Sequence, residues 1–192
     1  MLKLILIRHG ETDYTCAKRF CGAIDAPLNN AGIGQAQRLA KLLGRKTIDV
    51  VYTSPLVRAV QTAGIIFGKR SVKIHKSALL RETYLGKWEG LTLKEIEKRF
   101  PADVKRWYEE PMTFGAPGGE DLLTLQHRVK RFLKMLLINY RNSNPHKRIA
   151  IVSHSGPLRI ILGEISGQGL NGFWESEPKT GGYQIVKLTN VS

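Results

Sequence analysis

Five polar side chains of this 192-residue chain stand at, or shortly after, the ends of short apolar segments, and together they suit a phosphate group. They are Arg8, His9, Ser54, Arg58 and His154. A guanidinium presents planar, forked N–H donors to a phosphate, and a helix N-terminus adds backbone N–H groups and a favourable dipole. Two guanidinium groups, two imidazoles and one helix N-terminus at a single place would hold a dianionic phosphate. The chemistry therefore depends on whether the fold brings these side chains together.

Apolar runs of the kind buried in parallel sheets predict five strands, over 2–7, 48–52, 72–74, 149–152 and 183–188. Helical patterns lie between them, over 33–43, 55–67 and 121–140. Ser54 is the expected N-cap of the second helix, with Pro55 at its first position. The alternation predicts an α/β fold, a three-layer sandwich with a mainly parallel central sheet and helices on both faces. Ligands of such sheets bind beyond the carboxyl ends of the strands, where the five polar side chains are expected.

The segment 77–119 interrupts this alternation. It is rich in glycine and proline and holds two short helical patterns, the first of which opens with a capping box of Thr92 and Glu95. We interpret it as a small helical lid inserted into a single domain that spans 1–192, because a chain of this length fits one core. Glu82, near the start of this segment, could supply a group for proton transfer.

The composition is that of a soluble globular protein, with 42% hydrophobic and 24% charged residues. No apolar run approaches the roughly 20 residues that span a bilayer, so no membrane association is expected. The run 1–7 is short and lacks a cleavage site for a signal peptide, and Cys16 and Cys21 form neither a disulfide framework nor a C-x-x-C motif. We therefore expect a cytoplasmic location.

The formal net charge of +14 fits a nucleic-acid ligand, a phosphorylated small molecule or a solvated basic surface. Nucleic acid is the least favoured, because lysine and arginine are spread along the chain and no binding module is recognisable. A small phosphorylated substrate fits both the charge and the five polar side chains. No set of metal ligands is evident, so neither a metal ion nor another cofactor is expected. The oligomeric state is not predicted.

Beyond these patterns, the chain resembles the histidine phosphatase superfamily, also called phosphoglycerate mutase-like. The matching segments occur in the expected order over 6–12, 22–28, 32–36, 52–63, 80–90, 117–120 and 152–156. An isolated Arg-His-Gly would be a weak signal, whereas all these segments at the expected spacing are a strong one. Within the family the pattern looks most like the small phosphatases, either the α-ribazole phosphatases of cobalamin synthesis or broad-specificity bacterial phosphatases.

The resemblance implies a phosphohistidine mechanism. His9 would attack phosphorus as the neutral ring, with its other nitrogen bonded to a backbone carbonyl. Arg8, Arg58 and His154 would bind the equatorial oxygens of the phosphoryl group. Glu82 would protonate the leaving group and then accept a proton from the hydrolytic water.

Further phosphate or substrate contacts are expected at Thr15, Cys21, Gly22 and Ser155. Two of these positions depart from the family pattern. Thr15 stands where the family often has Asn, and Cys21 stands where Ser or Thr is common. Because a thiol is a weak donor, we expect fewer phosphate contacts on this side. Thr12 is expected to contact the substrate or to support residues that do.

Other carboxylates near the predicted site have plainer explanations. Glu89 could in principle act as the acid in place of Glu82, although the family pattern makes it structural. Glu11 and Glu120 are expected to lie at helix ends or to support the site.

The remaining histidines and the aromatic residues of the segment 77–119 are less informative. The histidines expected to be structural or exposed are His75, His127 and His146. Trp88, Trp107 and Tyr108 are expected in the core of the lid, and stacking of Trp107 or Tyr108 on the substrate is the less favoured alternative. Substrate identity is expected to depend on how these rings fold over the pocket with Arg99, Lys105 and Arg106.

The sequence thus predicts a phosphomonoester hydrolase that acts on a small phosphorylated metabolite, with α-ribazole 5′-phosphate as one candidate. The first alternative is a phosphoglycerate mutase, which uses the same His9 and Glu82 chemistry but hands the phosphate back. The chain looks compact, as in the phosphatase branch, and this favours hydrolysis. The second alternative is a non-catalytic phosphate-binding module of the same fold, which is disfavoured because every expected catalytic position is filled.

Overall fold

A computed structural model describes residues 2–140, 146–175 and 178–189. In chain order its strands and α-helices are β1 (Leu2–Arg8), α1 (Asp13–Cys16), α2 (Asn30–Leu43), β2 (Val50–Thr53), α3 (Val57–Phe67), β3 (Ile74–Lys76), α4 (Leu93–Arg99), α5 (Pro101–Glu109), α6 (Leu122–Tyr140), β4 (Arg148–Ser153), α7 (Ser155–Ser166) and β5 (Tyr183–Leu188). Three short 3-10 helices are η1 (Ala78–Leu80), η2 (Gly86–Trp88) and η3 (Gly169–Gly172). Within these described ranges, no helix is long and apolar enough to cross a membrane.

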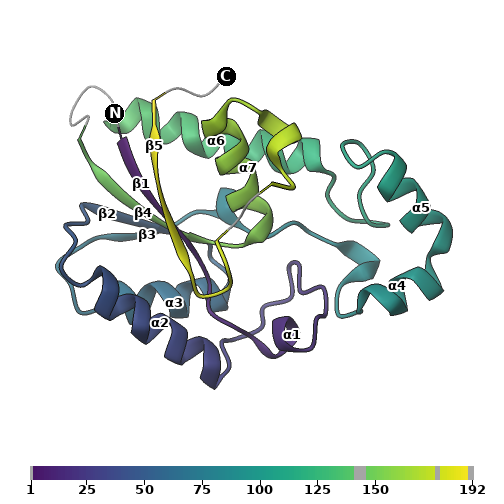
Figure 1. Cartoon of the computed structure of the whole chain (residues 1–192), viewed down its shortest axis with the longest axis horizontal. Coiled ribbons are helices and arrows are strands. Elements are labelled where there is room, and N and C mark those ends of the chain that lie inside the picture. Colours follow the sequence, from purple (N-terminus) through teal and green to yellow (C-terminus); the bar gives the residue numbers. More distant parts are fainter. Residues whose placement is uncertain (1, 141–145, 176–177, 190–192) are drawn as a thin grey trace.

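The central sheet has the strand order β3-β2-β4-β1-β5. The first four strands of that order are parallel, and β5 pairs antiparallel with β1 at one edge. Side chains alternate between the faces, so that Ile149 and Ile151 of β4 join one core cluster and Ala150 and Val152 join the other. Helices α6 and α7 cover one face, and α2 and α3 cover the opposite face (Figure 1). The predicted three-layer α/β fold is therefore confirmed.

The longest helix, α6, follows the apolar stripe predicted from the sequence. Its buried residues recur at helical spacing, at Leu122, Leu125, Val129, Phe132, Leu133 and Leu136. On the other face, α2 begins one residue earlier than the pattern suggested, because Asn29 is the cap and its side chain accepts a hydrogen bond from Gly32 N at 2.9 Å. These two helices account for much of the apolar cover of the sheet.

Three details of the predicted elements are wrong. Helix α3 begins at Val57, so Ser54 is not its N-cap; the carboxylate of Asp25, distant in sequence, accepts a hydrogen bond from Val57 N at 2.6 Å instead. The third strand lies at 74–76 rather than 72–74, because Val72 N is bonded in a turn to Arg70 O. The helix α7 directly after His154 was not predicted, although it carries part of the core.

The segment after η1 builds a small core of its own. Trp88, Ile96, Val104 and Ala116 are buried together there, and Figure 1 shows α4 and α5 to one side of the sheet. Both predicted helices are present, and the Thr92–Glu95 capping box that begins α4 is confirmed.

Two glycines allow the loop after β1 to lie directly against the start of α2. A Cβ on Gly10 would lie 2.5 Å from the carbonyl oxygen of Gly32, and a Cβ on Gly32 would overlap the carbonyl oxygen of Glu11. The backbone N–H of Asn29 donates to that same Glu11 oxygen at 3.0 Å. The position of His9, one residue before Gly10, therefore depends on this close approach.

We predict that Gly32→Ala lowers the free energy of unfolding by about 1–3 kcal/mol, because the new methyl group meets a backbone oxygen that cannot rotate away. This loss should occur even though alanine is the better helix former by about 1 kcal/mol. Gly34→Ala in the same helix is the matched control, since its Cβ would meet nothing closer than Arg38 Nη1 at 3.7 Å. Urea denaturation of both variants tests the prediction, and equal changes in the two would contradict it.

Candidate functional site

The register of three adjacent strands places the predicted polar side chains together. Arg8 at the end of β1 pairs with Ser153 of β4, and Thr53 at the end of β2 pairs with Val152 of β4. The next residue of each strand continues the pairing, since His9 N donates to Ser153 O at 3.0 Å and Ser54 N donates to Val152 O at 2.9 Å. His9, Ser54 and His154 therefore follow neighbouring strands at one edge of the sheet, as expected from the sequence.

The imidazole of His9 is neutral and has a defined tautomer. Its Nδ1 lies 2.7 Å from the carbonyl oxygen of Gly10, which can only accept, so the proton is on Nδ1 and the lone pair is on Nε2. Burial lowers the pKa of His9 to about 3; the charges of Arg58 and Arg8 also lower it, and the hydrogen bond to Gly10 opposes them. The ring therefore presents an unprotonated Nε2 at neutral and mildly acidic pH.

Arg58, in the first turn of α3, is almost completely buried and is held by three acceptors. Its Nη1 donates to Ile24 O at 2.6 Å, its Nη2 donates to Gly22 O at 2.7 Å, and its Nε donates to His154 Nδ1 at 3.2 Å. Because a guanidinium has five N–H groups and three are used here, two remain for a ligand. The side chain is a fixed positive charge at the wall of a cavity.

The imidazole of His154 supports Arg58 from behind. It is fully buried, accepts from Arg58 at Nδ1 and lies 2.8 Å from Ser54 Oγ at Nε2, so Nε2 is the protonated nitrogen. Burial lowers the pKa of His154 well below its ordinary value, and His9 and Arg58 add to this effect. The two histidine rings lie 4.9 Å apart. His154 does not line the cavity as the structure describes it, so the predicted direct phosphate contact stays a prediction.

A cavity of about 500 Å³ opens above His9. The charged and polar residues that line it are Arg8, His9, Thr15, Lys18, Arg19, Arg58, Glu82, Thr83, Glu120, Ser155, Arg159 and Thr180. Cations outnumber carboxylates in this set, which suits an anionic ligand. Lys18 and Arg19 come from the loop after α1, and Arg19 is paired with Glu95 at 2.8 Å.

Glu82 is brought to the same cavity by backbone donors. Its Oε1 accepts from Thr83 N at 2.9 Å and from Gly156 N at 3.1 Å, the latter near the start of α7. A Cβ on Gly156 would lie 2.7 Å from this oxygen, so the close approach requires glycine. The predicted proton-transfer group therefore shares the cavity with His9.

Arg128 of α6 fixes the backbone that carries Glu82. Its guanidinium donates to Leu79 O at 2.9 Å and to Glu82 O at 3.1 Å. The same group makes a two-pronged contact with the carboxylate of Glu120, at 2.7 and 2.9 Å. Glu120 is thus a supporting residue, as expected from the sequence.

The four predicted contacts at Thr15, Cys21, Gly22 and Ser155 all line the cavity. The hydroxyl of Thr15 is occupied by its own helix end, since it donates to Thr12 O at 2.9 Å and accepts from Thr12 N at 2.8 Å. The thiol of Cys21 donates to Ile24 O at 3.5 Å, and burial raises its pKa. Neither departure from the family pattern therefore presents a free donor to the cavity in this conformation.

The other carboxylates considered from the sequence hold loops in place. Glu89 Oε1 accepts from Ala23 N at 2.7 Å and from Leu85 N at 3.1 Å, so it ties the loop after β1 to the segment around η2. Glu11 Oε1 accepts from the side chain of Asn29 at 2.9 Å, beside the start of α2. Both positions agree with the structural roles expected for them.

Several lining residues were not singled out from the sequence. They are Phe20, Phe114, Arg159, Phe173 and Trp174. Arg159 lies one helical turn after Ser155 on α7, and its Nε donates to Ser155 Oγ at 3.3 Å, so recognising α7 would have revealed it. The aromatic residues arrive from loops and short helices, for which spacing gave no signal.

Among the residues expected to fold over the pocket, Trp107 lines the described cavity, whereas Arg99, Lys105 and Arg106 do not. Arg106 is paired with Glu110 at 3.1 Å on the surface of α5. Trp88 is buried in the small core, as expected.

The remaining histidines lie outside the cavity, and all three are exposed: His75, His127 and His146. Within the described ranges, no three side chains among His, Cys, Asp and Glu gather as a metal-binding group.

Comparisons with known proteins agree with this geometry. A family model described as histidine phosphatase superfamily (branch 1) matches residues 4–191. Phosphoserine phosphatase 1 of Hydrogenobacter thermophilus is 33% identical over 188 residues, which cover 98% of this chain and 87% of that protein. Glucosyl-3-phosphoglycerate phosphatase of Mycobacterium tuberculosis is 30% identical over 163 residues, covering 83% and 73%.

A solved structure has the same fold throughout. The α-ribazole phosphatase from Shigella flexneri aligns with a TM-score of 0.89 at 28% identity, covering 97% of this chain and 91% of that one. Because the family model spans nearly all of the chain, the assignment does not rest on one short motif. The chain belongs to the histidine phosphatase superfamily, branch 1, and is a phosphatase of that family.

Proposed function

We propose that the protein hydrolyses phosphomonoesters of small metabolites through a phosphohistidine at His9. The observation that carries this proposal is the buried, neutral imidazole of His9, with its proton held on Nδ1 by the Gly10 carbonyl and its Nε2 beside two arginines. In the first step the Nε2 lone pair forms an N–P bond while the ester P–O bond breaks. Water then attacks phosphorus, the N–P bond breaks and its electron pair returns to Nε2, releasing inorganic phosphate.

Arg8 and Arg58 would bind the phosphoryl oxygens and stabilise the charge that spreads over them in the transition state. Both line the cavity next to His9, and Arg58 keeps two N–H groups for this purpose. His154 would act mainly through Arg58, because its ring nitrogens are bonded to Arg58 and to Ser54. A phosphoryl oxygen could take the place of the Ser54 hydroxyl and make the direct contact that the family resemblance implies.

Glu82 would serve first as the acid and then as the base. In its protonated form it gives a proton to the oxygen of the leaving alcohol, and as a carboxylate it accepts a proton from the attacking water. Its support is geometric: it lines the cavity with His9, and its backbone is held by Arg128. Glu89 is unsuited to this role, because its carboxylate is occupied by two backbone donors.

The segment 77–119 would act as the lid of the single domain 1–192. It contributes Glu82, Trp107 and Phe114 to the cavity lining and has its own small core. The substrate would be one of the small phosphate esters of the family. The names of the relatives point to phosphoserine, glucosyl-3-phosphoglycerate and α-ribazole 5′-phosphate as candidates.

We predict that His9→Ala lowers kcat for phosphate release from p-nitrophenyl phosphate roughly a thousandfold or more, because the nucleophile is lost. The matched control is His127→Ala, an exposed histidine of α6 outside the cavity, which should keep the wild-type rate. EDTA should leave the wild-type rate unchanged. Full activity of His9→Ala, or no hydrolysis of any ester in a panel between pH 5 and 8, would refute the proposal.

The lowered pKa of His9 gives a separate prediction. Because that pKa is about 3, the ring should stay neutral throughout pH 5–8, with the proton on Nδ1 and none on Nε2. Long-range ¹H–¹⁵N spectra of the free enzyme, with the His9 signals assigned by their loss in His9→Ala, measure this directly. A titration midpoint near the ordinary histidine value of about 6.5 would show that the site does not keep the nucleophile neutral.

A further inference from the structure

The outer part of the catalytic cavity is lined by aromatic rings. We call this group the aromatic wall, and its members are Phe20, Trp107, Phe114, Phe173 and Trp174. They come from separate parts of the chain: the loop after α1, helix α5, the loop after α5, and the end of η3. The phosphate end of the same cavity is lined by arginines, so the cavity has a cationic floor and an aromatic rim.

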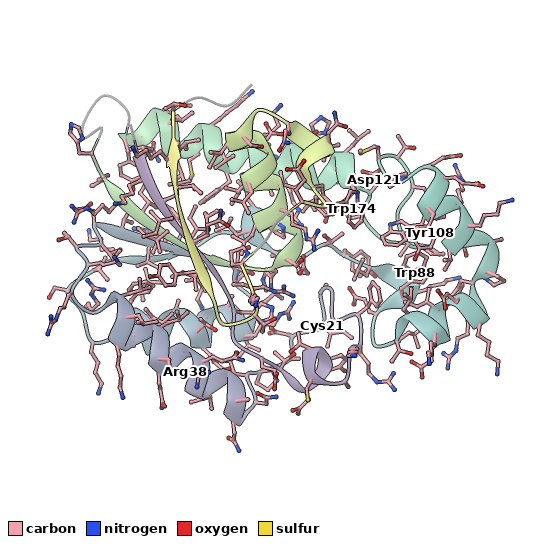
Figure 2. The ribbon with its side chains drawn as sticks, in the orientation of Figure 1. Cys21, Arg38, Trp88, Tyr108, Asp121 and Trp174 are labelled. Carbon is pink, nitrogen blue, oxygen red and sulfur yellow. The ribbon has the colours of Figure 1, made fainter. Side chains whose placement is uncertain are left out.

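Contacts among the rings hold this wall together. Trp174 packs edge-to-face against Trp107, with ring centroids 6.0 Å apart, and against Phe173 at 4.8 Å. Trp107 in turn packs edge-to-face on the buried Trp88 at 5.7 Å. Figure 2 shows Trp174 on the side of the molecule that faces Tyr108 and the other residues of α5. The wall is therefore anchored in the small core of the segment 77–119.

Arg159 connects the aromatic wall to the helix that follows His154. Its guanidinium carbon lies 5.6 Å from the ring centroid of Phe173 and 5.8 Å from that of Trp174, and its Nη1 donates to Phe173 O at 3.0 Å. Because Arg159 also lines the cavity, Phe173 and Trp174 are positioned relative to the phosphate site.

The aromatic surface continues outward from the cavity into a groove of about 420 Å³. This outer groove shares Phe20, Trp107 and Trp174 with the cavity and adds Leu93, Tyr108 and Pro111. No charged residue of the described chain lines it. Trp174 is 52% exposed and Tyr108 is 61% exposed, although burial of such rings would be favourable. An apolar ligand group that extends from the phosphate site would cover this surface.

We infer that the aromatic wall binds a planar aromatic ring system in the alcohol part of the phosphate ester. The substrate class is then a phosphomonoester whose alcohol carries an aromatic heterocycle, and this inference rests on the proposed function. The cavity volume of about 500 Å³ falls within the range of roughly 300–1,000 Å³ found for sites that enclose drug-sized ligands. A small polar alcohol such as serine would leave the aromatic wall bare.

The experiment compares phosphate esters that release the same kind of alcohol. Ribose 5-phosphate, adenosine 5′-monophosphate and α-ribazole 5′-phosphate all lose phosphate from a primary 5′-oxygen, so differences in kcat/KM report binding of the ring rather than leaving-group reactivity. We expect at least one ring-bearing ester to exceed ribose 5-phosphate by about fivefold or more, the lower end of what base–aromatic stacking contributes. Trp174→Ala should abolish that preference and leave kcat/KM for ribose 5-phosphate within about twofold of wild type.

Two further variants separate stacking from general damage. Trp174→Tyr keeps an aromatic ring and should retain most of the preference, whereas Leu42→Ala removes an exposed apolar side chain of α2 outside the cavity and should retain all of it. The inference is overturned if neither ring-bearing ester is preferred, or if Trp174→Ala lowers kcat/KM equally for all three esters. Failure of the proposed function would look different, since then neither ribose 5-phosphate nor p-nitrophenyl phosphate would be hydrolysed.

Discussion

The site depends on the burial of one positive charge, the guanidinium of Arg58. A buried cation is costly unless acceptors surround it, and here the acceptors are Gly22 O, Ile24 O and His154 Nδ1. Through these three bonds the charge fixes the loop before α2 and sets the tautomer of His154. The same charge lowers the pKa values of both His9 and His154. One buried arginine thus connects the second strand–helix unit to the other two strand ends.

A neutral nucleophile and an anion site arise from the same charges. Arg58 and Arg8 disfavour protonation of His9, which leaves Nε2 with a free lone pair, and they also attract the phosphate that this lone pair would attack. When a dianionic phosphate is bound, it offsets the positive potential that the empty site carries. Binding and activation are therefore aspects of one electrostatic arrangement rather than separate devices.

The sequence could predict this inner part of the site because it depends on strands. Apolar runs locate the strands, parallel strands end at one edge, and residues such as His9 and His154 stand at those ends. The family resemblance added the roles of Arg58 and Glu82. Details that depend on contacts between distant segments were missed: Asp25 rather than Ser54 caps α3, and Arg128 holds the Glu82 backbone.

The outer part of the site could not be predicted for the same physical reason. Phe20 and Trp174 come from segments without a periodic pattern, and their meeting with Trp107 is decided by loop conformation and by packing on Trp88. Thr15 shows the limit of assigning a contact by residue type, since its hydroxyl bonds to Thr12 instead. Substrate preference belongs to this outer region, whereas the phosphoryl chemistry belongs to the strand ends.

The most direct test of the central claim is a rapid-quench experiment with a ³²P-labelled phosphate ester. The enzyme is stopped in alkali during the first turnover and the labelled peptide is identified; Glu82→Gln is run in parallel to slow breakdown of the intermediate. The mechanism predicts an alkali-stable, acid-labile label on the peptide that contains His9, as a P–N bond requires. Label on another side chain, or complete turnover with no label in either enzyme, would contradict it.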